Sequence, residues 1–126
     1  MSNEPILIVD DNPANLKLVR VLLSAEGFDV RGASDAEEAL AILAAFHPSL
    51  ILMDLQLPGM DGLILTTKLK ADPATREIAI VALTAYAMKG DDQKAYAAGC
   101  DGYITKPIDT RILTREIRRF LAEREA

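Results

Sequence analysis

Acidic and polar residues stand at the ends of several short apolar runs in this chain. Asp10 and Asp11 directly follow one run, and Asp54 ends another. Thr84 ends a third run, and Lys106 follows a fourth. Carboxylates that are crowded together repel one another and lose hydration, so such a group needs a cation. These residue types predict a site for a divalent metal and a phosphoryl group.

Each candidate residue suits one part of phosphoryl transfer to a carboxylate. Asp54 is the candidate nucleophile, because a carboxylate can attack phosphorus and carry an acyl phosphate. Asp10 and Asp11 supply the oxygen ligands that Mg²⁺ prefers. Lys106 offers a positive charge, and Thr84 a hydroxyl donor, to the phosphoryl oxygens.

Taken singly, each of these residues also has an ordinary structural explanation. Aspartate after a strand commonly serves as a turn or cap residue, and Asp10, Asp11 and Asn12 could all cap a following helix. Threonine packs well in a buried strand because it is β-branched. The functional interpretation rests on all five residues occurring together at the ends of predicted strands.

Apolar runs of strand length alternate with helical patterns along the whole chain. This alternation predicts an α/β domain whose parallel sheet is covered by helices on both faces. The predicted strands span residues 6–9, 29–32, 50–53, 80–83 and 103–105. Because the carboxyl ends of parallel strands meet at one edge of a sheet, the candidate residues should line a single crevice.

Caps and breakers predict the helices between these strands. The first helix begins at Pro13 and ends at Gly27, and a capping box of Ser34 and Glu37 opens the second, which reaches Ala45. A third helix ends near residue 71 and a fourth spans 89–98. Asp109 caps the last helix, whose apolar stripe is Leu113, Ile117, Phe120 and Leu121.

The composition narrows the class of protein. The 126 residues, half of them hydrophobic, predict a single domain over 1–126 with no output domain. A net charge of −5 argues against direct nucleic-acid binding. No apolar run reaches the length of a membrane span, and the lone Cys100 suits a reducing cytoplasm. With His47 as the only histidine, a phosphohistidine donor must be a partner protein.

Together these segments resemble the receiver domain of two-component response regulators. The matching residues are 6–12, 52–54, 57–62, 83–85, Tyr103 and 106–107, and the resemblance covers essentially the whole chain. Residues 84–91 and 99–100 look like single-domain, CheY-like receivers of the DivK type. The resemblance implies a flavodoxin-like (βα)5 fold with a doubly wound, five-stranded parallel sheet of order 2-1-3-4-5.

The resemblance also implies roles for particular residues. Asp54 would accept a phosphoryl group from a histidine kinase or histidine phosphotransfer protein, with Mg²⁺, or Mn²⁺ in its place. Asp11, Asp54 and the main-chain carbonyl of Gln56 would touch the metal directly, and Asp10 would act through water. The domain would catalyse only its own phosphorylation and hydrolysis, so it is not expected to be an enzyme with a separate substrate.

A conformational switch follows from the same resemblance. Thr84 and Tyr103 match the hydroxyl and aromatic switch positions, which would alter binding to a downstream protein target. The Lys106–Pro107 peptide bond would be cis.

The first predicted helix offers a candidate surface for the histidine-bearing partner. It begins next to the crevice, so a partner that reaches Asp54 must pass over it. At about 100° per residue, one stripe of the helix suits the sheet, while Leu18 and Val21 point away and Leu22 lies at the flank. The sheet-facing stripe consists of Leu16, Val19 and Leu23.

Other functions could use similar residues or the same fold. An aspartate-based phosphatase of the haloacid dehalogenase type usually carries an Asp-x-Asp pair and a cap insertion, whereas Asp10 and Asp11 are adjacent here. A flavodoxin-type FMN binder would place a phosphate where these acids repel it. A receiver excised from a hybrid kinase is a further alternative, with the same chemistry.

Overall fold

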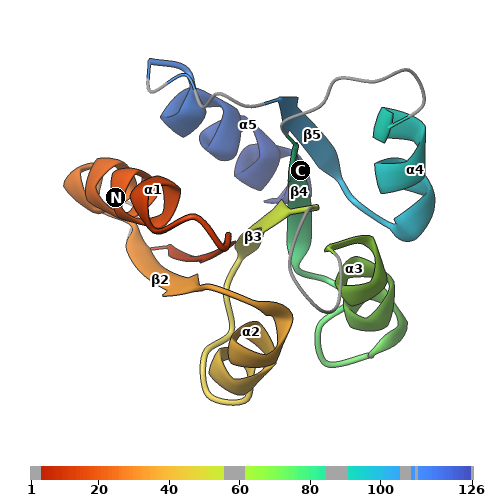
Figure 1. Cartoon of the computed structure of the whole chain (residues 1–126). Helices are drawn as coiled ribbons and strands as arrows, with labels where there is room; N and C mark the ends of the chain where they lie inside the picture. Colours follow the sequence, from red (N-terminus) through yellow and green to blue (C-terminus); the bar gives the residue numbers. More distant parts are fainter. Residues whose placement is uncertain (1–3, 56–61, 85–90, 106–108, 110, 126) are drawn as a thin grey trace.

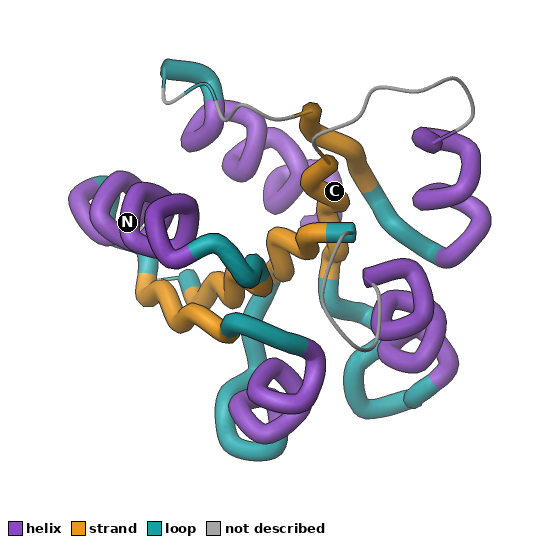
Figure 2. The backbone as a smooth tube through the Cα atoms, in the orientation of Figure 1, coloured by secondary structure: helices purple, strands orange, loops and turns teal. Residues whose placement is uncertain are grey.

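Five parallel strands form one sheet, with helices on both faces (Figures 1 and 2). The computed structural model describes residues 4–55, 62–84, 91–105, 109 and 111–125. The strands are β1 (Pro5–Val9), β2 (Asp29–Ala33), β3 (Leu50–Asp54), β4 (Ala79–Thr84) and β5 (Gly102–Thr105). The helices are α1 (Pro13–Ala25), α2 (Ala36–Leu43), α3 (Gly62–Ala71), α4 (Asp91–Ala98) and α5 (Leu113–Glu125).

The strand order is β2-β1-β3-β4-β5, which confirms the predicted flavodoxin-like arrangement. Every neighbouring pair is parallel, so all five carboxyl ends lie at the same edge of the sheet. Among the described residues, no helix is both long and apolar enough to cross a membrane.

Two apolar layers hold the sheet between the helices. Ile6 and Leu52 belong to the layer beneath α1 and α5. Leu7 and Ile51 belong to the layer beneath α2, α3 and α4. All four of these strand residues are fully buried, because successive side chains point to opposite faces and both faces are covered. The central strands therefore read as continuous apolar runs rather than as alternating patterns.

The ends of α1 are fixed by local hydrogen bonds. The Asn12 side chain is the N-cap and accepts from the main-chain N–H groups of Ala14 and Asn15. At the other end Gly27 has a φ of 95°, and Phe28 N–H donates to the Leu23 carbonyl at 3.1 Å. This is a Schellman motif, which confirms the helix end predicted at Gly27.

The capping box predicted for α2 was wrong by one residue. The N-cap is Asp35, whose Oδ1 accepts from the Glu38 N–H at 2.7 Å. Glu38 Oε1 in turn accepts from the Ser34 N–H at 2.8 Å. Both Ser34/Glu37 and Asp35/Glu38 fit the capping pattern, and an aspartate carboxylate accepts more strongly than a serine hydroxyl. The helix also ends at Leu43, before the predicted Ala45.

The last helix has the predicted apolar stripe but starts later than Asp109. Asp109 opens a turn in which its carbonyl accepts from the N–H groups of Ile112 and Leu113, where α5 begins. Hydrogen bonds from Arg111 lower the pKa of the Asp109 carboxyl. The stripe residues Leu113, Ile117, Phe120 and Leu121 are all buried.

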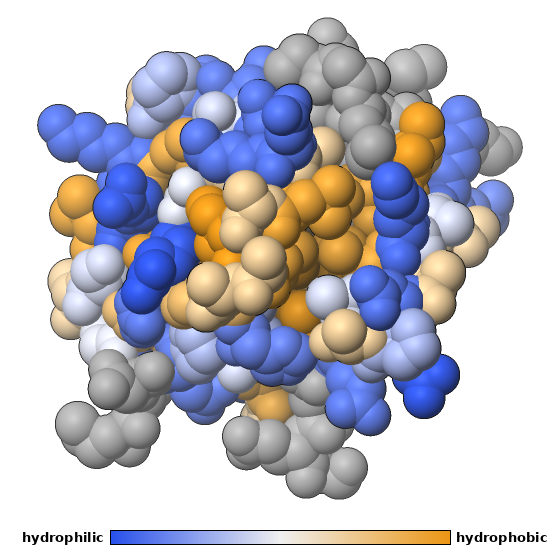
Figure 3. Space-filling model, turned by 90° about the horizontal axis from the view of Figure 1, so that it is seen from below, coloured by the Kyte–Doolittle hydropathy of each residue, from blue (hydrophilic) through white to orange (hydrophobic). Residues whose placement is uncertain are grey.

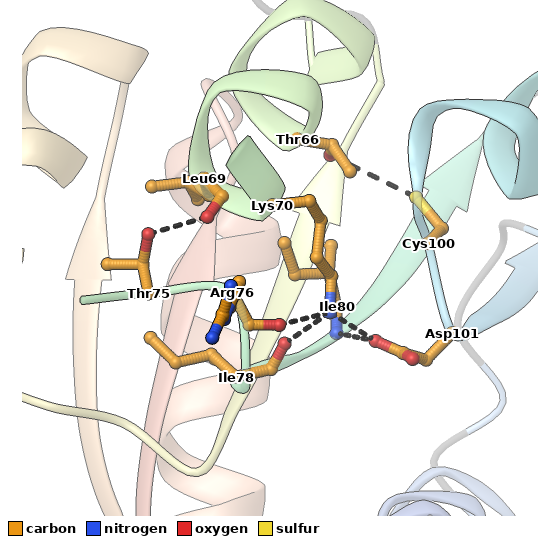
Figure 4. Close-up of polar contacts among 9 residues, drawn as sticks. All are labelled: Thr66, Leu69, Lys70, Thr75, Arg76, Ile78, Ile80, Cys100 and Asp101. Carbon is orange, nitrogen blue, oxygen red and sulfur yellow. Dashed lines mark hydrogen bonds and ion pairs between the residues drawn. The ribbon is translucent and has the colours of Figure 1, made fainter. Parts of the chain in front are cut away.

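A lysine latch joins α3, β4 and β5 at the end of the sheet opposite the carboxyl ends (Figure 4). Lys70 Nζ donates to the carbonyl oxygens of Arg76 and Ile78 at 3.2 and 2.8 Å, and to Asp101 Oδ2 at 2.9 Å. Asp101 Oδ2 also accepts from the Ile80 N–H at 2.8 Å. All three ammonium hydrogens thus have an acceptor.

Cys100 lies beside the latch as a buried, unpaired thiol. Its Sγ is 3.9 Å from Thr66 Oγ1. Burial raises the pKa of the Cys100 thiol to about 11, so the group stays protonated and unreactive at neutral pH.

Replacing Lys70 with methionine should lower the free energy of unfolding by about 1–2 kcal/mol. The methionine keeps the apolar stem, but two main-chain carbonyls and one carboxylate lose their donor. The estimate stays modest because the Asp101 side chain is 45% exposed. Urea denaturation measures the change. Lys94→Met, at an exposed position of α4, should change stability by less than about 0.5 kcal/mol, and equal losses in both variants would contradict the latch.

Candidate functional site

Asp10 and Asp54 lie side by side at the carboxyl edge of the sheet. β1 pairs with β3 through Val9 and Met53, so the next residue of each strand is an aspartate. Both side chains are almost fully buried, with exposed fractions of 0% and 2%. Asp11 follows immediately and is exposed. The two strands thus place two carboxylates inside the domain and a third at its surface.

The three carboxylates form a cluster that suits a divalent cation. One oxygen from each of Asp10, Asp11 and Asp54 can be chosen so that all three lie within 4.8 Å of one another. At that separation two negative charges repel by about 3 kcal/mol for an effective dielectric constant of ~20. A hard cation with oxygen ligands removes this repulsion, and Mg²⁺ fits such a donor set.

The carboxylate of Asp10 is held by the start of α1. Its Oδ1 accepts from the Asn12 N–H at 2.9 Å, and its Oδ2 accepts from Asn15 Nδ2 at 3.3 Å. The sequence alone did not identify Asn15 as part of the site. Its position in the first turn of the helix after the acid pair was the available signal, because that turn packs against the carboxyl edge.

Gly62, the first residue of α3, packs closely against the main chain of Asp54. A Cβ atom added to Gly62 would lie 2.4 Å from the Asp54 carbonyl oxygen and 2.8 Å from the Leu55 Cα. Gly62 N–H also donates to the Leu55 carbonyl at 3.2 Å. Glycine is required here by the close approach of two backbones.

The structure describes the other predicted site residues only in part. Thr84 ends β4 one residue beyond Leu83, the register partner of Asp54, so its backbone reaches the same edge. Tyr103 is half-buried on β5, pairs with Ala82 and packs against the layer beneath α2, α3 and α4. The three remaining predictions, Gln56 and the Lys106–Pro107 peptide, lie outside the described residues.

Comparisons with known proteins agree on one family. A family profile described as "Response regulator receiver domain" matches residues 6–118. The polar-differentiation response regulator DivK of Brucella ovis is 42% identical over 118 residues, covering 94% of this chain and 96% of that protein.

Solved structures of similar proteins have the same fold. A CheY-like receiver domain protein from Methanospirillum hungatei JF-1 is 34% identical, with a TM-score of 0.89 over 97% of this chain and 96% of that one. The receiver domain of a sensor histidine kinase from Pseudomonas aeruginosa PAO1 is 32% identical, with a TM-score of 0.86 over 95% and 98%. That structure has a magnesium ion coordinated in its active site cleft.

Replacing Asp11 with alanine should weaken Mg²⁺ binding at least tenfold, a loss of about 1.4 kcal/mol. The variant removes one of three clustered carboxylates without disturbing the buried pair. Isothermal titration calorimetry measures the affinity. Asp29→Ala, which removes an exposed aspartate of β2 away from the cluster, should bind Mg²⁺ as the unmodified chain does. An unchanged affinity in Asp11→Ala would show that the metal does not bind at this cluster.

Proposed function

The chain belongs to the response regulator receiver family, and on that premise we propose that Asp54 is the residue that accepts its phosphoryl group. The family is a signalling family of two-component systems, and its members bind Mg²⁺ in an acidic pocket. The observation that carries the proposal is the burial of Asp54 at the end of the central strand, beside Asp10 and Asp11.

The proposed reaction transfers a phosphoryl group from a phosphohistidine of a histidine kinase or histidine phosphotransfer protein. A carboxylate oxygen of Asp54 bonds to phosphorus, the nitrogen–phosphorus bond breaks, and the imidazole leaves with the electron pair and takes up a proton. The product is an acyl phosphate on Asp54. Attack of water on that phosphorus then restores the carboxylate and releases inorganic phosphate, which ends the signal without a separate substrate.

The metal ligands form part of the proposal. Asp11, Asp54 and the Gln56 carbonyl would hold Mg²⁺, or Mn²⁺ in its place, and Asp10 would act through water. The hydrogen bonds that both Asp10 oxygens accept support this outer role, because they already occupy part of its acceptor capacity. When bound, the cation neutralises negative charge on the carboxylates and the phosphoryl oxygens.

Three residues on or directly after β4 and β5 would respond to phosphorylation. Lys106 would pair with the phosphoryl oxygens, and Thr84 would donate its hydroxyl to one of them. Tyr103 would follow Thr84 into a different packing, and this shift would change binding to a downstream protein target. The pairing of β4 with β5 up to Thr84 and Thr105 supports the coupling, because a shift of one strand end acts on the other.

The exposed side of α1 is the proposed docking surface for the phosphohistidine protein. Leu18 and Val21 are 41% and 62% exposed, and Leu22 is half-buried against the core. Val19 and Leu23 are buried and Leu16 is partly buried against the core, which supports the proposed division of the helix into a sheet-facing and an exposed side. Asn12 connects this helix directly to the carboxylate cluster, so a partner lying on α1 borders Asp54.

Neither of the competing functions is favoured. Membership of the receiver family argues against a haloacid dehalogenase-type phosphatase and against an FMN binder. A receiver excised from a hybrid kinase would use the same site and the same chemistry. We also place the protein in the cytoplasm, where the buried and unpaired Cys100 would stay reduced.

Replacing Asp54 with asparagine should abolish phosphorylation by acetyl phosphate and Mg²⁺. The amide keeps the size of the side chain but is not a nucleophile for phosphorus. Intact-protein mass spectrometry should show one added phosphoryl group on the unmodified chain and none on the variant. Full labelling of Asp54→Asn would assign the acceptor to another residue.

Replacing Leu18 with aspartate should slow phosphotransfer from the partner protein at least tenfold, equivalent to about 1.4 kcal/mol. A charge on this surface opposes apolar docking, while acetyl phosphate needs no docking surface and should label the variant normally. Radiolabel transfer from a phosphorylated histidine protein measures the rate. Tyr96→Asp, which charges an exposed apolar position on α4, should transfer at the normal rate. Equal losses with both donors would mean that Leu18→Asp damages the crevice and that the docking surface lies elsewhere.

A further inference from the structure

The helices on the two sides of the sheet contribute differently to the surroundings of the carboxylate cluster. Apolar side chains gather at the centre of the side formed by α2 and α3 (Figure 3), and the exposed members of these helices include Leu40 and Ile64. On the other side of the sheet, the first turn of α1 directs polar groups towards the buried Asp10. The orientation of the Asp10 carboxylate therefore depends on α1.

Two donors from the start of α1 hold the two oxygens of Asp10 separately. Oδ1 accepts from the Asn12 N–H at 2.9 Å, and Oδ2 accepts from Asn15 Nδ2 at 3.3 Å. One donor on each oxygen opposes rotation of the carboxylate about its Cβ–Cγ bond. The first donor is a main-chain group, whereas the second belongs to a side chain that a substitution can remove.

Asn15 is itself fixed by the N-cap of the helix. Its main-chain N–H donates to Asn12 Oδ1 at 3.2 Å, and its side chain is half-buried. Within the described residues, the side-chain amide of Asn15 forms a hydrogen bond only with Asp10. The cap uses the main chain of Asn15 alone, so a different side chain at this position removes the contact with Asp10 and leaves the cap in place.

Asp11 is held differently, although it is the next residue after Asp10. It is exposed, and within the described part of the chain its side chain forms no hydrogen bond or ion pair. A carboxylate in this position can turn towards a cation without breaking an existing contact. Of the two adjacent aspartates, one is therefore free to bind a metal ion directly and the other is clamped.

The distances within the cluster do not by themselves keep Asp10 from binding a metal ion directly. One oxygen from each of Asp10, Asp11 and Asp54 lies within 4.8 Å of the others. Two oxygen ligands of one octahedral Mg²⁺ lie up to ~4.2 Å apart, because each bond is about 2.1 Å long. A small rotation of Asp10 would bring its carboxylate onto the ion, and the two donors from α1 oppose that rotation.

We infer that Asn15 is a positioning residue, which holds Asp10 one water molecule away from the bound cation. This inference rests on the proposed metal site, and it gives a physical reason why Asp11 and Asp54 bind the ion directly whereas Asp10 does not. Mg²⁺ retains several of its water molecules in protein sites. The acceptor capacity left on the clamped Asp10 oxygens suits a hydrogen bond from one of these waters, and partners of this outer kind orient the groups around a metal ion.

Replacing Asn15 with leucine tests this role, because leucine has a similar volume and no donor. Mn²⁺ is the probe, since relaxation dispersion of water protons counts the water molecules bound directly to this paramagnetic ion. Asn15→Leu should bind one water fewer than the unmodified chain, because Asp10 turns and replaces it. Asn15→Gln, which keeps an amide donor, and Lys17→Leu, which alters an exposed residue of α1, should both retain the full number. An unchanged count in Asn15→Leu, or the same loss in Lys17→Leu, overturns the inference.

Asp10→Ala identifies the group that displaces the water. In that background no carboxylate remains at residue 10, so adding Asn15→Leu should leave the count of bound waters unchanged. A further loss would mean that another group enters the coordination sphere, which also overturns the inference. If the unmodified chain binds neither Mn²⁺ nor Mg²⁺, the proposed metal site fails and this inference fails with it. If the unmodified chain binds Mn²⁺ and Asn15→Leu has the same count, this inference alone fails.

Discussion

Electrostatic repulsion among Asp10, Asp11 and Asp54 is the constraint around which this domain is arranged. Three carboxylates within 4.8 Å of one another, two of them almost fully buried, oppose folding. The apolar layers on both faces of the sheet supply the stabilisation that keeps β1 and β3 together at this point. Donors from the first turn of α1 offset part of the repulsion at Asp10. A bound cation would offset the remainder, so the same cluster that disfavours folding favours ligand binding.

The two edges of the sheet are built differently. At the carboxyl edge, negative charge is concentrated and α3 begins in direct contact with the Asp54 backbone through Gly62. At the opposite edge, Lys70 and Asp101 join the ends of α3, β4 and β5 by charge-assisted hydrogen bonds. Thr84 ends β4 at the carboxyl edge, whereas Tyr103 lies two residues after Asp101 on β5. The proposed switch therefore connects the carboxyl edge with the strand that the Lys70–Asp101 contact holds, through the pairing of β4 with β5.

The sequence predicted those features that depend on short spacings. Acids directly after apolar runs located the ends of β1 and β3, and the helical spacing separated the buried from the exposed face of α1. The strand order came from the resemblance to receivers, because apolar periodicity does not specify which parallel strands are neighbours.

The features that were not predicted from the sequence depend on long-range contacts or on overlapping local signals. The Lys70–Asp101 contact joins residues 31 positions apart, and no local pattern encodes it. The requirement for glycine at residue 62 arises from its distance to another backbone segment, which only the folded chain defines. The N-cap of α2 was misassigned because Ser34 and Asp35 both satisfy the same short motif.

The lysine latch also has a consequence for covalent chemistry at amines. Acylation of lysine requires a nitrogen lone pair that is free to attack a carbonyl carbon. Three acceptors surround the Lys70 nitrogen and its side chain is only 20% exposed, so an acylating agent has little access to this amine. Lys17 and Lys94 are exposed on helix surfaces and have no comparable protection. An acylating agent should therefore modify Lys17 and Lys94 before Lys70, the lysine that joins α3 to β4 and β5.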